Sequence, residues 1–276
     1  MVIDFHTHAF PDKIAQKTIE ILAEKSGATP HTDGTVKGLY AQLESAHADL
    51  GVALPVVTNP RQFDSINRFA KGINEQYGAG KTRIVSFGGI HPACEDIDGK
   101  MRFLKESGFL GVKIHPDYQE TFINDEGYIR ILQCAKELDM IVVTHAGVDE
   151  GYKDFPVRCP PELALEVIQR VGHSKFVLAH FGGNRYTQKV YELLAGQDVY
   201  FDTSFVLADV GKEIFQKTLQ KHGADRILFA TDCPWRDIGE EIARIRSYGL
   251  TKETEEKILW RNAADLLGIS GENYEL

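Results

Sequence analysis

The chain has 276 residues, 43% of them hydrophobic, which is enough apolar material for one large domain with a buried core. Its net charge of −9 argues against a general role in binding nucleic acids or anionic membranes, because both partners are themselves negatively charged. The four cysteines form no Cys-x-x-Cys pair, so neither a disulfide framework nor a structural zinc site is expected. With no signal peptide and no apolar run long enough to span a membrane, we expect a cytoplasmic protein.

Short apolar runs alternate with segments of helical spacing along the whole chain. The first predicted strand begins at residue 2, and the others begin near residues 51, 83, 111, 140, 175, 199 and 226. Helices are predicted at residues 11–26, 36–49, 65–77, 97–107, 126–138, 161–171, 187–195, 211–222, 238–248 and 252–267. Several strands are continuous apolar runs, which is typical of parallel strands buried on both faces.

This alternation predicts eight β/α units. Eight units in a chain of this length are typical of a closed (β/α)₈ TIM barrel, here a single domain over residues 1–276 with two extra C-terminal helices. An open, doubly wound sheet is the alternative. No Gly-x-Gly-x-x-Gly follows the first strand, which removes the usual dinucleotide-binding form of that fold.

Polar side chains gather at the ends of the predicted strands, which is where TIM barrels carry their chemistry. These residues are His6, His8, His91, Lys113, His115, His145, His180, Asp202 and Asp232. Histidines that merely fill a core would be expected at scattered positions. The clustering therefore favours a functional site.

The His6-Thr-His8 motif is the centre of this set. Side chains alternate along a strand, so both imidazoles are expected on one face, about 7 Å apart along the chain. Neutral imidazole binds zinc and other transition metals. Taken alone, the motif is equally compatible with two surface histidines. Asp4 is expected one layer lower, either orienting a ligand histidine or as a buried carboxylate without a metal role.

Barrel closure decides which strand ends can meet. The first and last strands become neighbours, so Asp232 can reach a metal ion held by His6 and His8, and His145 can approach from across the mouth. Three imidazoles and one carboxylate leave a position open for water, which is the arrangement of a catalytic metal site. His180 is then placed to accept a proton, and Asp232 can share that role.

Five motifs, in this order, resemble the amidohydrolase superfamily. They are Asp-Phe-His-Thr-His, Val-Lys-Ile-His-Pro, Thr-His-Ala-Gly, Leu-Ala-His-Phe-Gly-Gly and Phe-Ala-Thr-Asp-Cys-Pro-Trp. More narrowly, the chain resembles the branch of TIM-barrel metal-dependent hydrolases related to aminocarboxymuconate-semialdehyde decarboxylase, from residue 3 to about residue 269. The resemblance implies that His6, His8, His145 and Asp232 bind a metal ion, usually zinc, and that His180 activates water.

The resemblance leaves the reaction open. The main hypothesis is a hydrolase in which metal-activated water attacks the carbonyl of an amide, ester or lactone in a small, carboxylate-bearing substrate. The alternative is a metal-dependent, non-oxidative decarboxylase of a small unsaturated or aromatic carboxylate. A non-catalytic barrel is a third reading, which the presence of every expected ligand disfavours. A small molecule is the expected partner, and a homodimer is left open.

The expected number of bound metal ions depends on whether Lys113 is carboxylated. Binuclear members of the superfamily carry a carboxylated lysine at this place, and His145 and His180 would then bind a second ion. A single Zn²⁺ is favoured, with Lys113 and His115 lining the pocket and Lys113 available to an anionic substrate. A buried ion pair between Lys113 and Asp202 is the other reading.

Two loop residues complete the predicted substrate site. Arg158 could clamp a carboxylate, or be a solvated loop charge. Trp235 could wall the pocket, or serve only in packing.

Overall fold

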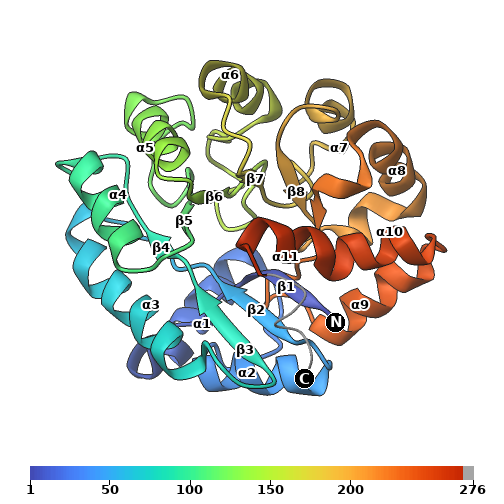
Figure 1. Cartoon of the computed structure of the whole chain (residues 1–276), viewed down its shortest axis with the longest axis horizontal. Coiled ribbons are helices and arrows are strands. Elements are labelled where there is room, and N and C mark those ends of the chain that lie inside the picture. The colour runs from blue at the N-terminus through green and yellow to red at the C-terminus, as the bar shows by residue number, and fades with distance from the viewer. Residues whose placement is uncertain (270–276) are drawn as a thin grey trace.

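The computed structural model describes residues 1–269, so the last seven residues of the predicted domain, 270–276, lie outside the described residues. Parallel strands form the centre of the molecule, and helices surround them (Figure 1). The strands are β1 (Ile3–Thr7), β2 (Leu50–Ala53), β3 (Arg83–Ser86), β4 (Gly88–Gly89), β5 (Gly111–Ile114), β6 (Ile141–Thr144), β7 (Phe176–Leu178), β8 (Tyr200–Asp202) and β9 (Ile227–Leu228).

The helices follow the strands in the predicted alternation. The α-helices are α1 (Asp12–Ser26), α2 (Val36–Ser45), α3 (Phe63–Tyr77), α4 (Ile97–Glu106), α5 (Glu126–Glu137), α6 (Pro161–Val171), α7 (Thr187–Lys189), α8 (Leu207–His222), α9 (Ile238–Ser247), α10 (Lys252–Glu256) and α11 (Asn262–Leu267). Short helices of other types are η1 (Pro60–Gln62), η2 (Val190–Leu194), η3 (Ala224–Arg226) and η4 (Lys257–Arg261). Among the described residues, no helix is long and apolar enough to cross a bilayer.

The strands run in chain order around the sheet. β1, β2 and β3 form one ladder, and β4 to β9 form another, all with parallel pairing. The two ladders meet at Phe87, where β3 pairs with β2 and β4 pairs with β5. At the other seam, Phe5 N donates to Phe229 O at 2.9 Å and Asp232 N donates to His6 O at 2.8 Å. The arrangement is the predicted (β/α)₈ TIM barrel.

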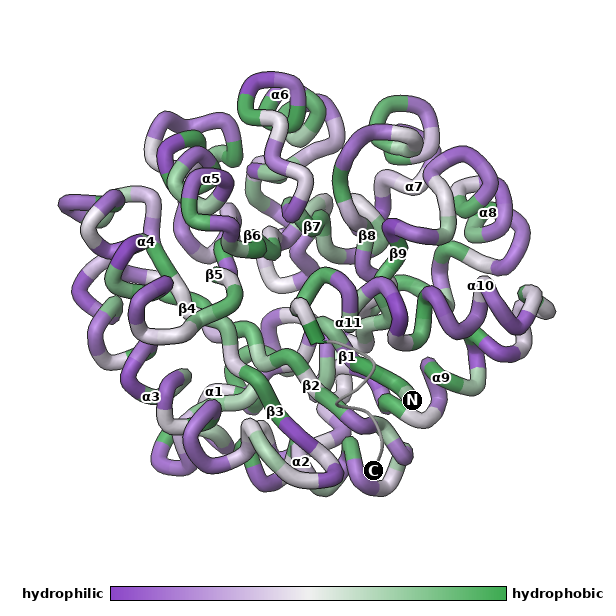
Figure 2. The backbone as a smooth tube through the Cα atoms, in the orientation of Figure 1, coloured by the Kyte–Doolittle hydropathy of each residue, from purple (hydrophilic) through white to green (hydrophobic). Residues whose placement is uncertain are grey.

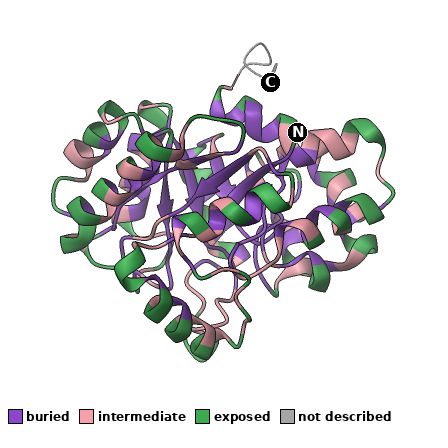
Figure 3. Ribbon diagram, turned by 90° about the horizontal axis from the view of Figure 1, so that it is seen from below, coloured by how far each residue is buried: buried purple, intermediate pink, exposed green. Residues whose placement is uncertain are grey.

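Two apolar layers hold the barrel together. Inward-facing residues of the strands, such as Phe5 and Val143, form an inner cluster together with Phe87 between β3 and β4 and with Ala263 and Leu267 of α11. A larger cluster lies between the strands and the surrounding helices. The strands are the hydrophobic and buried part of the fold, whereas polar, exposed residues lie on the outward helix faces (Figures 2 and 3). The inner cluster therefore fills one end of the barrel, with α11 across it.

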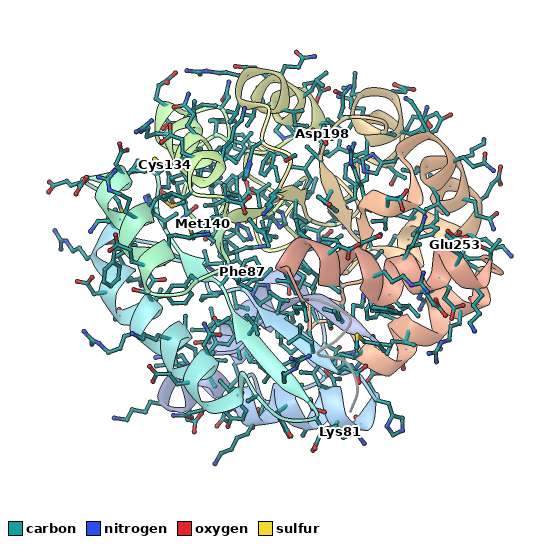
Figure 4. All side chains as sticks on the ribbon, in the orientation of Figure 1. Lys81, Phe87, Cys134, Met140, Asp198 and Glu253 are labelled. Carbon is teal, nitrogen blue, oxygen red and sulfur yellow. The ribbon has the colours of Figure 1, made fainter. Side chains whose placement is uncertain are left out.

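Charged side chains lie on the periphery of the molecule, in contrast to the apolar side chains of its interior. Lys81 and Glu253 extend from the rim in Figure 4, whereas Phe87 and Met140 lie within the fold and are fully buried. Burial of such apolar side chains is the main favourable term in folding, at about 25 cal/mol for each Å² removed from water.

Helix ends follow local capping chemistry. Asp125 begins α5 by accepting a hydrogen bond from Gly127 N at 2.9 Å, and Gly27 ends α1 in the left-handed conformation that glycine adopts without strain. The helix predicted at residues 36–49 ends at Ser45, because His47 has a φ of 54°. The predicted C-terminal helix at 252–267 is helical throughout but passes through the π-helical η4.

Candidate active site

The β1 strand places two histidines at the mouth of the barrel through a local irregularity. Its pairing register with β2 shifts between Asp4 and Thr7. Ile3 and Phe5 both join the inner apolar cluster, and His6, the residue after Phe5, also lies inside the barrel, 1% exposed. Strict alternation would have placed Phe5 and His6 on opposite faces. The shift is what lets an apolar layer support the polar site directly.

Three ligand atoms meet at the end of β1. His6 Nε2 and His8 Nε2 are 3.2 Å apart, and Asp232 Oδ1 lies 3.0 Å from His8 Nε2 and 3.3 Å from His6 Nε2. These three residues form the triad that we refer to below. Two imidazole nitrogens and a carboxylate oxygen at this spacing suit a divalent transition metal. Burial lowers the pKa of His6 well below its usual value, which keeps the ring in the neutral, ligating form.

In each triad histidine, the hydrogen bond at Nδ1 fixes the tautomer of the ring. His6 Nδ1 lies 2.8 Å from Asp202 Oδ2, and His8 Nδ1 lies 3.0 Å from the carbonyl oxygen of Leu54. Because both partners accept, both Nδ1 atoms donate, and both Nε2 atoms keep a lone pair for a metal ion. The donor set of the triad therefore fits a metal ion in chemistry as well as in distance.

We expect Asp202→Asn to weaken metal binding by about 10–100-fold, the usual cost of losing such an orienting carboxylate. The neutral amide is a weaker acceptor for His6 Nδ1–H than the carboxylate is. Metal affinity, measured by competition with a chromophoric chelator, gives the comparison. Asp198→Asn is the matched control, because Asp198 just precedes β8 and is exposed, with an ion pair to Arg226. Equal affinities in the two variants would contradict this role of Asp202.

His180 forms the second part of the site. Its Nδ1 lies 3.1 Å from the carbonyl oxygen of Ser204, so Nδ1 donates and Nε2 keeps the lone pair. Its backbone N donates to Asp202 Oδ1 at 2.9 Å, which ties His180 to the carboxylate that orients His6. His180 and Asp232 have φ angles of 58° and 66°, a region that non-glycine residues rarely adopt. Strained backbone of this kind is concentrated at functional sites.

His145 lies next to His180 and outside the triad. Its Nδ1 is 2.9 Å from His180 Nε2, and its Nε2 faces Asp117 Oδ2 at 3.8 Å. Both His145 Nε2 and Asp117 Oδ2 are buried without a hydrogen-bond partner. Neither nitrogen of His145 thus joins the three triad atoms, and its role as a fourth ligand stays a prediction.

Lys113 is fully inside the barrel beside the triad. It is 1% exposed, and its Nζ lies 3.1 Å from His6 Nε2. Burial lowers the pKa of the Lys113 amine to about 8, although the carboxylates of Asp202 and Asp232 act in the opposite direction. The hydrogen bond of this amine goes to His6, whereas Asp202 is bonded to His6 and Ser204. Lys113 is therefore a buried cation at the triad rather than one half of a closed ion pair with Asp202.

A cavity of about 1110 Å³ opens onto these residues. Its wall includes the triad, Lys113, His115, His145, His180 and Trp235. Nearly all the predicted site residues are therefore brought to one cavity.

Arg158 is the exception, because it is not among the residues that line the cavity. Its side chain lies against the buried Asp117, with Nη1 3.5 Å from Asp117 Oδ1. The loop that carries Arg158 turns its guanidinium toward this carboxylate. The prediction of direct substrate binding by Arg158 is thus not supported by its position.

Of the two readings of Asp4, the structure agrees with the buried carboxylate rather than with the orienting one. Its carboxylate accepts from Thr231 Oγ1 at 2.5 Å and from Thr231 N at 3.0 Å, and it touches no histidine ring. Asp202 has the role considered for Asp4. The sequence signal for Asp202 was its place at the end of a predicted strand, but nothing in the pattern showed which ring it would meet.

Comparisons with known proteins agree with this fold. A model of the amidohydrolase family matches residues 3–269. No curated protein matches the chain. An uncharacterized TIM-barrel protein from Bordetella bronchiseptica superposes with a TM-score of 0.75 at 16% identity, covering 97% of this chain and 98% of that chain.

Two further solved structures are decarboxylases. One is a dihydroxybenzoic acid decarboxylase from Polaromonas sp. JS666 with bound manganese and the inhibitor 2-nitroresorcinol, similar at a TM-score of 0.71 and 14% identity, covering 100% of this chain and 99% of that one. The other is the 5-carboxyvanillate decarboxylase from Sphingomonas paucimobilis, at 0.70 and 13%, covering 98% and 99%. At these identities the likeness establishes the fold alone.

The family model covers all but the first two of the described residues. The resemblance seen in the five motifs is thereby confirmed, and the chain belongs to the amidohydrolase family of enzymes.

Proposed function

We propose that this protein is a metal-dependent, non-oxidative decarboxylase of a small unsaturated or aromatic carboxylate. The observation that carries the proposal is the buried Lys113 amine, 3.1 Å from His6 Nε2 in the wall of the cavity. A cation at this place suits a substrate carboxylate lying next to the triad. The decarboxylases among the structural neighbours support the same reaction class.

The triad would hold one divalent ion, zinc or the manganese found in a neighbouring structure. When bound, such an ion supplies a positive charge that orients substrate oxygens and stabilises negative charge developing on them. A metal ion held by His6 Nε2 would need the lone pair that now accepts from Lys113. The Lys113 ammonium would then be free to pair with the substrate carboxylate.

Decarboxylation leaves a carbon that must gain a proton, and we assign this transfer to His180. Its Nδ1–H is anchored on Ser204 O, so Nε2 is the nitrogen at which a proton can be gained or lost. Apolar side chains of the cavity wall, among them Leu54, Phe69 and Trp235, suit an unsaturated or aromatic ring.

Hydrolysis of an amide, ester or lactone is the second candidate function, and the family membership of the chain favours it. The same residues would serve, with His180 and Asp232 moving protons between water and the leaving group. The two reactions differ in which solvent atom reaches the product.

Turnover in ¹⁸O-labelled heavy water separates them. For a decarboxylase we expect carbon dioxide to be released and one solvent deuterium on carbon in the remaining product, with no ¹⁸O in that product. Mass spectrometry of the non-volatile product makes the measurement, because carbon dioxide itself exchanges oxygen with water. Solvent ¹⁸O in the product without release of carbon dioxide would instead establish hydrolysis.

A further inference from the structure

Three buried polar atoms around Asp117 have no hydrogen-bond partner. They are Asp117 Oδ2, His145 Nε2 and Arg158 Nη1. His145 Nε2 lies 3.8 Å from Asp117 Oδ2, and Arg158 Nη1 lies 3.5 Å from Asp117 Oδ1. Most buried polar groups in folded proteins are paired, because leaving them unpaired is costly. Three unpaired atoms at one place indicate that another state of the site pairs them.

The hydrogen bonds of His180 explain why His145 Nε2 is unpaired. His180 Nδ1 donates to Ser204 O, so His180 Nε2 can only accept. His145 Nδ1, 2.9 Å away, must therefore donate to His180 Nε2. Burial lowers the pKa of His145 well below its usual value, so the ring is neutral and carries a single proton. Its Nε2 then has a lone pair beside the Asp117 carboxylate, and two acceptors form no hydrogen bond.

In this tautomer His145 cannot serve as the predicted fourth ligand through Nδ1. Nδ1 is the nitrogen beside His180, whose ring faces that of His6 with centroids 5.5 Å apart. A proton on Nδ1 occupies the lone pair that a metal ion needs. In the other tautomer, with the proton on Nε2, Nδ1 has that lone pair, His180 Nε2 no longer accepts from His145, and His145 Nε2 is a donor for Asp117.

Asp117 is held in place for this contact by Arg158. The backbone N of Arg158 donates to Asp117 Oδ1 at 3.3 Å, and the guanidinium lies against the same oxygen. The loop is fixed in turn, because Arg158 O accepts from Ile123 N at 2.9 Å. Asp117 is only 2% exposed. Oδ1 is thus engaged, and Oδ2 is left as the acceptor beside His145.

These groups do not form a second cation site, although His115, His145 and Asp149 lie close together. His115 Nδ1 accepts a hydrogen bond from Tyr118 N at 3.3 Å, so the His115 ring is protonated on Nε2. The rings of His115 and His145 are stacked, 13° from parallel, with centroids 4.3 Å apart. The lone pair of an imidazole lies in the plane of its ring, so those of two stacked rings do not converge on one ion. Asp117 is therefore better explained as a partner of His145.

We propose that Asp117 is a positioning residue that favours the tautomer of His145 with its proton on Nε2, in which Nδ1 can bind the metal ion. Formation of the Nε2–H···Oδ2 hydrogen bond closes the distance from 3.8 Å to the usual value of about 2.7–3.2 Å. The proton lost from Nδ1 and the proton gained by Nε2 are exchanged with solvent, so the ring stays neutral. The inference rests on the metal-binding part of the proposed function and holds for decarboxylation and hydrolysis alike.

The tautomer of His145 in the native enzyme is the direct test. The protein is labelled with ¹⁵N in its histidines, and the ring nitrogens are measured by NMR without metal and with an equimolar amount of Zn²⁺. The signals of His145 are those missing from His145→Gln. We expect the proton on Nδ1 without metal and on Nε2 with zinc. The same tautomer in both states would overturn the proposal.

Asp117→Asn is the informative variant. Its amide oxygen can keep the hydrogen bond from Arg158 N, which places an NH₂ donor beside the lone pair of His145 Nε2. This favours the proton on Nδ1, so we expect zinc to bind about 10–100-fold more weakly, as measured with a chromophoric chelator. Asp154→Asn, an exposed position in the loop that leads to Arg158, is the matched control.

The NMR spectrum separates positioning from a merely structural role. At zinc concentrations that saturate the native enzyme, we expect His145 of Asp117→Asn to keep its proton on Nδ1. A lower Tm with native zinc affinity and the native change of tautomer would overturn the proposal. Loss of one of two bound ions would make Asp117 a ligand and would overturn it as well. Failure of the proposed function would look different: zinc would still change the tautomer while no acid released carbon dioxide.

Discussion

Asp232→Asn is expected to remove the bound metal ion and reduce turnover to the background rate. Asp232 Oδ1 lies within 3.3 Å of both histidine Nε2 atoms, so it is the anionic member of the triad. Loss of a residue that orients a ligand weakens metal binding by about 10–100-fold. Loss of the Asp232 carboxylate, a ligand itself, should weaken metal binding more. Asparagine is the appropriate replacement because it tolerates the φ of 66° at this position.

The measurements are metal content after dialysis and the rate of carbon dioxide release. Asp225→Asn is the matched control, because Asp225 precedes β9 by a short stretch, is exposed and pairs with Lys257. Native metal content together with native turnover in Asp232→Asn would contradict the assignment of the triad.

His180→Asn is expected to lower kcat by about 10²–10⁴-fold, the usual contribution of a positioned acid or base. Metal content should stay as in the native protein, because His180 is not one of the three triad ligands. Its φ of 58° again makes asparagine the suitable replacement. The rates are measured with the carboxylate that releases carbon dioxide in the isotope experiment.

His47→Asn is the control for this variant. His47 is exposed and also has a positive φ, 54°, so it matches both the chemical change and the backbone geometry. A fall from two bound ions to one in His180→Asn would contradict the single-metal proposal. It would favour the binuclear site, with Lys113 carboxylated, and the intact mass of the protein would then show one added carbon dioxide.

The fold could be predicted from the sequence because each strand is a short apolar run followed by helical spacing. Every strand start lies within one residue of its predicted position except β4, which continues the segment of β3. Local apolar patterning decides these boundaries, and barrel closure then follows from the number of units. The clustering of histidines at the strand ends could be predicted from the same strand boundaries.

The details of the site depended on features that a periodic pattern does not contain. The register shift in β1 lets His6 share the interior with Phe5. Asp4 bonds Thr231, which decides between its two readings in favour of a buried carboxylate. Asp202 meets His6 across 196 positions of sequence, a contact that only closure creates. His115 and His145 look alike as strand-end histidines, yet a single backbone N–H, that of Tyr118, makes the first of them a donor.

The helix α11 has a practical consequence. Ala263 and Leu267 pack into the inner apolar cluster, so the barrel is sealed at the end opposite the triad. In the part of the chain that the structure describes, the cavity lies at the mouth, and we expect small molecules to enter and leave there. Anchoring the enzyme to a solid support through the exposed face of α11 should leave that mouth facing the bulk solution, so immobilised and free enzyme should show the same KM.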